Sequence, residues 1–190
     1  MEPYYQEKNI QPKVFVSMNK ENIEAYTPKN AIDLIVEYIP KDYVVWAPFS
    51  RNKHNFADYL RSLGYKVYNT HYNPTTEEGD DFLTYKPDFR FDIILDNPPF
   101  KNKTKYVERA ISFEKPFALF LPFNSFGDNG IPNLFLKHNL EPQLLIPDKR
   151  VEFLNQKKKG ISFKTVYICN KVLPKQIIFK RLGQEVLALV

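Results

Sequence analysis

The segment Asn97-Pro98-Pro99-Phe100 carries the clearest chemical pattern in the sequence. An amide side-chain oxygen followed by a proline carbonyl places two hydrogen-bond acceptors next to each other. The two prolines restrict φ and bring no backbone N–H that could compete for these acceptors. Phe100 adds a flat face on which a heteroaromatic ring can stack. The pattern predicts a site that holds an NH2 group attached to an aromatic ring.

An amino group of this kind is a poor nucleophile because its lone pair is delocalised into the ring. Two acceptors that bind both N–H groups favour a pyramidal nitrogen whose lone pair is no longer delocalised into the ring, and they stabilise the positive charge that grows on the nitrogen. We expect Asn97 and Pro98 to polarise the amine, Pro99 to stiffen the turn and Phe100 to stack on the ring. A base in a duplex must first leave the stack. The structural alternative is a strand end closed by a rigid turn.

Apolar segments of strand length and helix length alternate along the chain and position this motif. Thr27 is expected to cap the first helix, and Pro28 fits its first turn. Segments 177–179 and 186–190 are expected to form a terminal pair. The alternation predicts a single α/β domain whose seven-stranded, mostly parallel sheet has helices on both faces. The patterns place strands at 43–47, 65–68, 91–95, 117–121, 143–146 and 165–170, and helices at 27–39, 53–63 and 103–113.

Pro48, Asn97 and Pro122 each lie just past the carboxyl end of an expected strand. In open parallel sheets, ligands bind outside the carboxyl ends of the strands, near the point where the strand order reverses. We therefore expect the site at this edge of the sheet.

Composition and charge are those of a globular chain with a modest positive excess. The 190 residues are 43% apolar and 26% charged, and the formal net charge is +5. This charge is compatible with a polyanionic partner.

The cysteine and histidine residues do not indicate a metal site. Cys169, the single cysteine, lies in an apolar run and is expected to be buried, and His54, His71 and His138 are too scattered to bind a metal together. No segment reads as a signal peptide or a membrane span, so we expect a cytoplasmic protein.

The motif resembles the signature of the class I S-adenosylmethionine-dependent amino-methyltransferases, in which Asn or Asp precedes Pro-Pro and an aromatic residue. The similarity extends over about residues 24–170. Tyr26-Thr27-Pro28 resembles the family's Thr-Pro segment beside the methionine part of the cofactor. Ala47-Pro48-Phe49 occupies the place of the first cofactor loop, and Asp81-Phe82 resembles the segment that binds the cofactor's adenine.

This resemblance implies a Rossmann-like class I methyltransferase fold, S-adenosylmethionine as cofactor and no metal. In this family the Asn-Pro-Pro-Phe form is commonest for N6 of adenine, and it also occurs for N2 of guanine and for glutamine side chains in proteins. The implied domain organisation is an N-terminal arm (1–25), a methyltransferase-like catalytic domain (26–175) and a C-terminal extension (176–190). The implied cofactor contacts are Tyr26, Thr27, Pro28, Ala47, Pro48, Phe49, Asn69, Asp81 and Phe82.

Two segments depart from the family pattern. The first loop, Ala47-Pro48-Phe49-Ser50-Arg51, has neither the acid nor the glycines of the family's Asp-Pro-x-x-Gly-x-Gly. The second strand is followed by Asn69, where the family has an acidic residue for the ribose, and an amide binds hydroxyls less strongly than a carboxylate does. These departures favour an alternative function, that of a methyltransferase-like module that binds nucleic acid or a protein partner without catalysis.

Two groups of lysines are candidate phosphate contacts: Lys101, Lys103 and Lys105 after the motif, and Lys157, Lys158 and Lys159 farther along. The alternative for both groups is a solvated surface. We expect nucleic acid as the partner and no membrane. Target recognition is expected to come from a homodimer, from a partner subunit or from loops 69–90 and 122–133.

Overall fold

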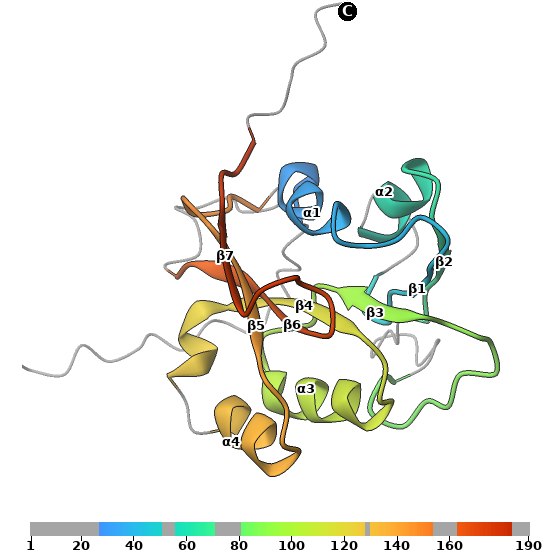
Figure 1. The fold of residues 1–190 in the computed structure, drawn as a ribbon. Coiled ribbons are helices and arrows are strands. Elements are labelled where there is room, and N and C mark those ends of the chain that lie inside the picture. The colour runs from blue at the N-terminus through green and yellow to red at the C-terminus, as the bar shows by residue number, and fades with distance from the viewer. Residues whose placement is uncertain (1–26, 51–55, 71–80, 128–129, 154–162, 184–190) are drawn as a thin grey trace, which may run out of the picture.

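A computed structural model of the chain describes residues 27–50, 56–70, 81–127, 130–153 and 163–183 (Figure 1). The helices are α1 (Lys29–Val36), α2 (Phe56–Ser62), α3 (Lys103–Ser112) and α4 (Gly130–Lys137). The strands are β1 (Val44–Trp46), β2 (Lys66–Tyr68), β3 (Ile93–Asp96), β4 (Phe117–Pro122), β5 (Gln143–Pro147), β6 (Thr165–Asn170) and β7 (Ile177–Lys180). A short 3-10 helix, Phe123–Phe126, follows β4.

The strands form one seven-stranded sheet in the order β2-β1-β3-β4-β6-β5-β7. The pairs β1–β2, β1–β3, β3–β4 and β5–β7 are parallel, whereas β6 runs antiparallel to both β4 and β5. Every residue of β3 and β4 is buried, because a parallel strand covered on both faces needs a continuous apolar run. The prediction of a seven-stranded, mostly parallel sheet is confirmed.

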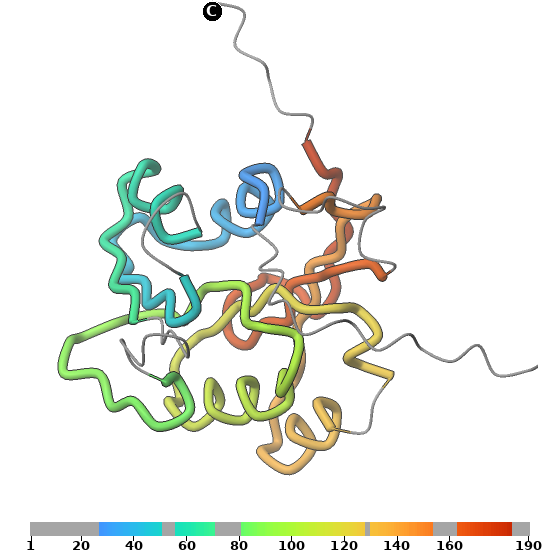
Figure 2. The backbone as a smooth tube through the Cα atoms, turned by 180° about the vertical axis from the view of Figure 1, so that it is seen from behind, coloured from blue at the N-terminus to red at the C-terminus, as the bar shows by residue number. Residues whose placement is uncertain are grey.

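Two hydrophobic clusters cover the two faces of the sheet. Helices α1 and α2 pack on one face, over residues that include Val45 and Leu95. Helices α3 and α4 pack on the other face, over residues that include Trp46 and Ile94. Neighbouring strand residues belong to different clusters because their side chains point to opposite faces. Figures 1 and 2 show the two helix pairs on opposite sides of the sheet, so the predicted two-sided covering is confirmed.

The strand order reverses at β1. The chain runs from β1 through α2 to β2 on one side, and it then crosses to β3 on the other side of β1. Val45 is therefore paired with both Val67 of β2 and Ile93 of β3. The carboxyl ends of these three strands lie side by side, and an open α/β sheet binds its ligands at such a reversal.

Helix α1 begins differently from the expectation. Pro28 is its N-cap residue, and no side chain among the described residues caps its first turn. Thr27 does not cap the helix, because its hydroxyl accepts a hydrogen bond from Asn97 Nδ2 at 2.9 Å. The expected cap is therefore wrong, and a tertiary contact has taken the place of the local one.

The sheet continues past residue 175, where we expected an extension to begin. Strand β7 pairs in parallel with β5, with Ile177 opposite Leu144. Lys180 Nζ donates to the carbonyl of Leu34 at 3.2 Å and forms an ion pair with Glu37, so β7 is tied to α1. Residues 177–180 are thus part of the sheet rather than of an extension, and the expected partner segment 186–190 lies outside the described residues.

The stretch 122–133, expected to be a recognition loop, contains the 3-10 helix and the start of α4. Helix α4 buries Ile131, Leu134 and Phe135 against the sheet. These residues recur at helical spacing, but Gly130 and Pro132 at the helix start resemble turn residues in the sequence.

None of the described helices combines the length and the hydropathy that crossing a membrane requires.

Candidate functional site

Strand β3 delivers the Asn-Pro-Pro-Phe motif to the carboxyl edge of the sheet. The strand ends at Asp96, after which Asn97 is half-buried, Pro98 buried, Pro99 exposed and Phe100 half-buried. The hydrogen bond from Asn97 Nδ2 to Thr27 orients the amide relative to the start of α1. The structure thus brings together the motif and the Thr-Pro segment, which are 70 positions apart in the sequence.

Phe100 packs among aromatic rings from the second half of the chain. Its centroid lies 5.4 Å from that of Phe163 and 6.3 Å from that of Phe153, with interplanar angles of 76° and 74°. These are edge-to-face contacts, a geometry that aromatic pairs favour. Phe153 is itself buried and packs on Phe120 of β4. The Phe100 ring is therefore held in a defined orientation beside Asn97.

Asp96 is the residue of this site that sequence reasoning missed. Its carboxylate is 1% exposed and accepts hydrogen bonds from Phe49 N–H at 2.6 Å, from Ser50 Oγ at 2.9 Å and from Asn97 N–H at 2.8 Å. Burial raises the pKa of Asp96 to about 6, against the opposing effect of the hydrogen bonds from Asn97, Phe49 and Ser50. One feature of the sequence could have identified Asp96: it is an acid at the last position of a buried apolar strand. An unpaired charge is costly there, so the acid needs hydrogen-bond partners.

We predict that Asp96 makes stability depend on pH. Because folding raises its pKa from 3.8 to about 6, the folded chain binds this proton more tightly. The stabilising contribution is complete below the unfolded value and is lost as the pH rises through about 6. Between pH 4 and pH 7, urea denaturation should show the wild type losing about 2 kcal/mol relative to Asp96→Asn. A constant difference between the two proteins across this range would contradict the assignment.

The loop after β1 lies directly beside Asp96. Ala47 and Pro48 are buried, and the N–H of Phe49 is the donor of the shortest hydrogen bond just described. The Phe49 ring lies 4.9 Å, between centroids, from each of the rings of Phe82 and Tyr106. Three aromatic rings from the first loop, the 81–85 turn and α3 therefore meet near the carboxyl end of β1. We call Phe49, Phe82 and Tyr106 the aromatic group.

Two expected cofactor contacts belong to this part of the site: Phe82 is a member of the aromatic group, and Asp81 directly precedes it in the chain. Asp81 is exposed, and its Oδ1 accepts a hydrogen bond from Leu83 N–H at 3.0 Å. Burial, and then the charge of Asp81, raise the pKa of Tyr106. The Phe82 ring is only 2% exposed, because the surrounding aromatic rings cover it.

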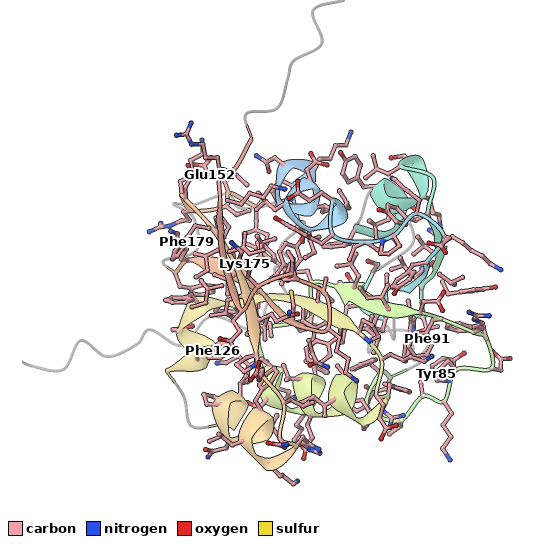
Figure 3. The ribbon with its side chains drawn as sticks, in the orientation of Figure 1. Tyr85, Phe91, Phe126, Glu152, Lys175 and Phe179 are labelled. Carbon is pink, nitrogen blue, oxygen red and sulfur yellow. The ribbon has the colours of Figure 1, made fainter. Side chains whose placement is uncertain are left out.

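Arg109 of α3 holds the 81–85 turn in place, a role that no pattern in the sequence indicates. Its Nη2 donates to Tyr85 O at 2.9 Å and its Nε to Phe82 O at 3.4 Å. The guanidinium carbon lies 4.4 Å from the centroid of the Phe113 ring. Tyr85 and Phe91, labelled in Figure 3, have ring centroids 6.1 and 5.0 Å from that of Trp46. A surface arginine on a helix cannot be assigned such long-range acceptors from its spacing alone.

Replacing Arg109 by Ala should lower the free energy of unfolding by about 2 kcal/mol, since two carbonyls lose a charged donor and a ring loses its cation. Arg109→Lys should recover only part of this loss because an ammonium lacks the planar fork. Arg90 is a matched control: it is 87% exposed and reaches Asp92 at 3.4 Å, so Arg90→Ala should change stability by less than about 0.5 kcal/mol. Equal effects of the two alanine variants in chemical denaturation would refute this assignment.

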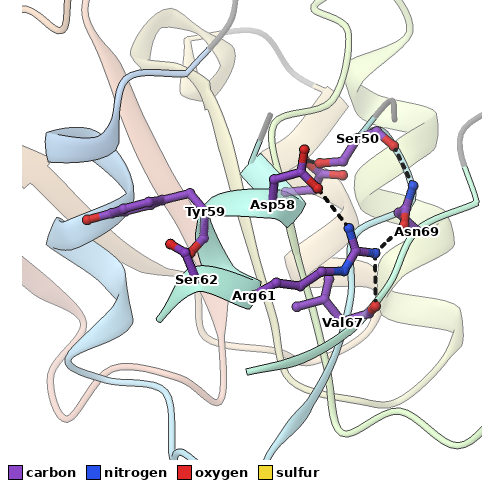
Figure 4. A network of polar contacts seen from close by, with 8 residues as sticks. Ser50, Asp58, Tyr59, Arg61, Ser62, Val67 and Asn69 are labelled. Carbon is purple, nitrogen blue, oxygen red and sulfur yellow. Dashed lines mark hydrogen bonds and ion pairs between the residues drawn. The ribbon is translucent and has the colours of Figure 1, made fainter. Parts of the chain in front are cut away.

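Asn69, the expected ribose contact, joins α2 to the first loop (Figure 4). Arg61 donates to Val67 O at 3.0 Å and to Asn69 Oδ1. Asn69 Nδ2 in turn donates to Ser50 O at 3.3 Å. The amide therefore lies at the carboxyl end of β2, where the family resemblance placed it, and its hydrogen bonds connect that end to the loop after β1.

The lysines that follow the motif lie at the start of α3. Lys101 and Lys105 are exposed, and Lys103 is half-buried. Asn102, between the first two, has a φ of 64° and turns the chain into the helix. The three lysines expected to contact phosphates after the motif therefore lie next to it at the start of α3. The remaining expected contacts, Tyr26, Lys157, Lys158 and Lys159, lie outside the described residues.

Comparison with known proteins finds similarity at the level of structure. No protein-family model matches the sequence, and no match is found among curated proteins. The methyltransferase subunit of a type I restriction-modification system from Streptococcus thermophilus matches with a TM-score of 0.57 and 14% identity, over 83% of this chain and 47% of that subunit. A protein from Pyrococcus horikoshii, proposed to be an RNA methyltransferase, matches with a TM-score of 0.55 and 18% identity, over 79% and 88% of the two chains.

A third structure is a proposed class I S-adenosylmethionine-dependent methyltransferase from Listeria monocytogenes, with a TM-score of 0.56 and 11% identity over 84% of this chain and 66% of the other. The chain spans about half of the length of the restriction-modification subunit and most of the archaeal protein. The sheet order, the helices on both faces and these similarities agree. The chain has the Rossmann-like fold of the class I methyltransferases.

Proposed function

We propose that this chain transfers a methyl group from S-adenosylmethionine to an exocyclic amino group, with N6 of adenine in DNA or RNA as the leading acceptor. The observation that carries the proposal is the position of Asn97. It follows β3, the neighbour of the strand β1 at which the strand order reverses, and it is hydrogen-bonded to Thr27 at 2.9 Å. The buried Pro98 and the ring-packed Phe100 come directly after it.

In the proposed reaction the motif binds and activates the acceptor amine. Asn97 Oδ1 and the carbonyl of Pro98 accept hydrogen bonds from its two N–H groups, which favours a pyramidal nitrogen whose lone pair is no longer delocalised into the ring. The same two acceptors stabilise the positive charge that forms on nitrogen, because they are in place before the reaction begins. Phe100 holds the acceptor ring by stacking, and the orientation of its own ring is set by Phe153 and Phe163.

The residues at the carboxyl ends of β1 and β2 suit the adenosyl part of the cofactor. An adenine ring needs apolar walls and an acceptor for its amino group. The aromatic group defined above and the exposed carboxylate of Asp81 offer both in one place. Ala47, Pro48 and Asn69 line the remaining side in this proposal, with Asn69 next to the ribose. When bound, S-adenosylmethionine supplies an electrophilic methyl group on a sulfonium.

A nucleic-acid acceptor agrees with the charge of the chain and with the lysines beside the motif. The net charge is +5, and Lys101 and Lys105 are exposed within a few residues of Asn97. The Pyrococcus horikoshii protein of the same fold is itself a proposed RNA methyltransferase. The match covers 47% of the Streptococcus thermophilus subunit. We propose that a homodimer or a partner subunit supplies target recognition.

The test is transfer of a tritiated methyl group from S-adenosylmethionine to separate pools of DNA, RNA and protein. Digestion of the labelled pool and chromatography then identify the modified nucleoside or side chain. N6-methyladenine in DNA or RNA supports the proposal in full. Label on N2 of guanine or on glutamine keeps the chemistry and changes the acceptor, whereas no label in any pool contradicts the proposed reaction.

A second candidate function is that of a binding module without catalysis, and one specific observation favours it. The first loop has no glycine, and the N–H of Phe49 donates to the buried Asp96 instead of facing a ligand. Calorimetry separates the two functions. Binding of S-adenosylmethionine that weakens in Asp81→Ala supports the enzyme, whereas no binding at millimolar cofactor supports the module.

A further inference from the structure

A continuous series of hydrogen bonds connects the ends of β1, β2 and β3. Asn69 Nδ2 at the end of β2 donates to Ser50 O at 3.3 Å. Ser50 Oγ in the loop after β1 donates to Asp96 Oδ1 at 2.9 Å. The same oxygen accepts the N–H of Asn97 at 2.8 Å, and Asn97 reaches Thr27 at 2.9 Å. Asp96 stands at the centre of this series, where the proposed cofactor residues and the proposed acceptor residues meet.

We infer that Asp96 is a positioning residue for the cofactor site, whose carboxylate holds the glycine-free loop Ala47–Ser50 and the backbone of Asn97 in one fixed arrangement. The inference rests on the proposed function, and it assigns a role to a residue outside the motif itself. Asp96 touches neither cofactor nor acceptor in this assignment. It acts through Phe49, Ser50 and Asn97, the three residues that donate to it.

The physical reason lies in what a loop without glycine must do to stay close to a ligand. Glycines let a backbone turn tightly without side-chain clashes. In Ala47–Ser50 every residue carries a side chain, and the loop conformation must be imposed from outside. A buried carboxylate can impose it because charge-assisted hydrogen bonds to backbone N–H groups are roughly twice as strong as neutral ones. The short bond from Phe49, 2.6 Å, is of this kind.

The ionised carboxylate accepts all of these hydrogen bonds as charge-assisted ones. Protonation removes the charge and places an O–H on one oxygen, which weakens these hydrogen bonds, and an amide in its place presents an NH2 donor where one acceptor was. Burial raises the pKa of Asp96 to about 6, so the change of state falls within an accessible pH range. Tyr167 of β6 is a described ionisable residue that senses the Asp96 charge: burial first, then the charges of Cys169, Asp96 and Asp33, raise its pKa well above the ordinary value.

The experiment measures the affinity of the full chain for S-adenosylhomocysteine by calorimetry between pH 5 and pH 7. If the cofactor binds well only when Asp96 is ionised, the wild-type Kd should fall by about tenfold from pH 5 to pH 7, because the ionised fraction of Asp96 rises over this range. Asp96→Asn should bind about tenfold more weakly than the wild type at pH 7 and should lose this pH dependence. Ser50→Ala removes one hydrogen bond to the charged form and should move the midpoint to higher pH.

Asp92→Asn is the matched control. Asp92 is also a carboxylate next to β3 that accepts a backbone N–H of β1, from Val44 at 2.9 Å, but at the opposite end of the strands. This variant should keep the wild-type affinity and the wild-type pH dependence. If Asp96→Asn does not fold, the shift in Ser50→Ala decides the matter. The histidines of the chain remain in every variant, so their titration cannot account for a difference between them.

Three outcomes overturn the inference. A wild-type Kd that does not change with pH, or an Asp96→Asn protein that keeps both the affinity and the pH dependence of the wild type, removes the positioning role while leaving the methyltransferase proposal intact. A midpoint that is unmoved in Ser50→Ala does the same. A wild-type chain that does not bind S-adenosylhomocysteine at all contradicts the proposed function itself, and the two failures are thereby distinguished.

Discussion

Replacing Asn97 by Ala is expected to lower the rate of methyl transfer by about 100-fold to 1,000-fold, the range found when one preorganised hydrogen-bond partner of a transition state is removed. The side chain lies outside the buried end of β3 and is half-buried, so its loss should leave the sheet intact. Binding of the cofactor should change little, because the adenosyl part is assigned to Asp81 and the aromatic group. Single-turnover transfer of tritiated methyl, together with calorimetry, measures both quantities.

Two further variants separate chemistry from positioning at this residue. Asn97→Asp keeps an acceptor oxygen in place and should retain more activity than Asn97→Ala. Thr27→Val removes the hydroxyl that receives the 2.9 Å hydrogen bond from Asn97 and should lower the rate by a smaller factor. Equal transfer by the wild type and Asn97→Ala would show that the motif does not activate the amine.

Replacing Trp46 by Ala should lower the free energy of unfolding by about 3–5 kcal/mol, the usual cost of deleting a buried aromatic side chain. Trp46 is 0% exposed. Its ring centroid lies between 5.0 and 6.1 Å from those of five others: Phe82, Tyr85, Phe89, Phe91 and Phe113. The indole N–H donates to Thr70 Oγ1 at 3.0 Å. The cavity would open under the loop that carries Ala47 and Pro48.

Urea denaturation followed by circular dichroism measures this loss, since the variant lacks the single tryptophan of the chain. Trp46→Phe keeps a ring in the cluster and should lose only about 1–2 kcal/mol. Phe179→Ala is a control on an edge strand: the side chain is 75% exposed (Figure 3) and its removal should cost less than about 0.5 kcal/mol. A loss below about 1 kcal/mol in Trp46→Ala would contradict the packing described here.

The sequence by itself determined the class of fold and the place of the motif in it. The strands 43–47, 91–95, 117–121 and 165–170 could be predicted because short apolar runs end at prolines or polar residues, and these are local properties. The position of Asn97 after a buried strand followed from the same pattern. Its placement at a carboxyl edge needed only the rule that parallel sheets bind ligands there. Seven strands and two covered faces then followed from the alternation of elements.

Only the tertiary structure decided which side chains meet. Thr27 has the local chemistry of a helix cap, yet its hydroxyl pairs with Asn97. Asp96 looks like the last residue of a strand, and two of its three donors, Phe49 and Ser50, come from a loop about 46 positions earlier. Strand β7 became an edge of the sheet because β5 and α1 offered it partners far away in the sequence. Periodicity reports the face a residue presents, whereas the partner on that face depends on how distant segments pack, which no local pattern encodes.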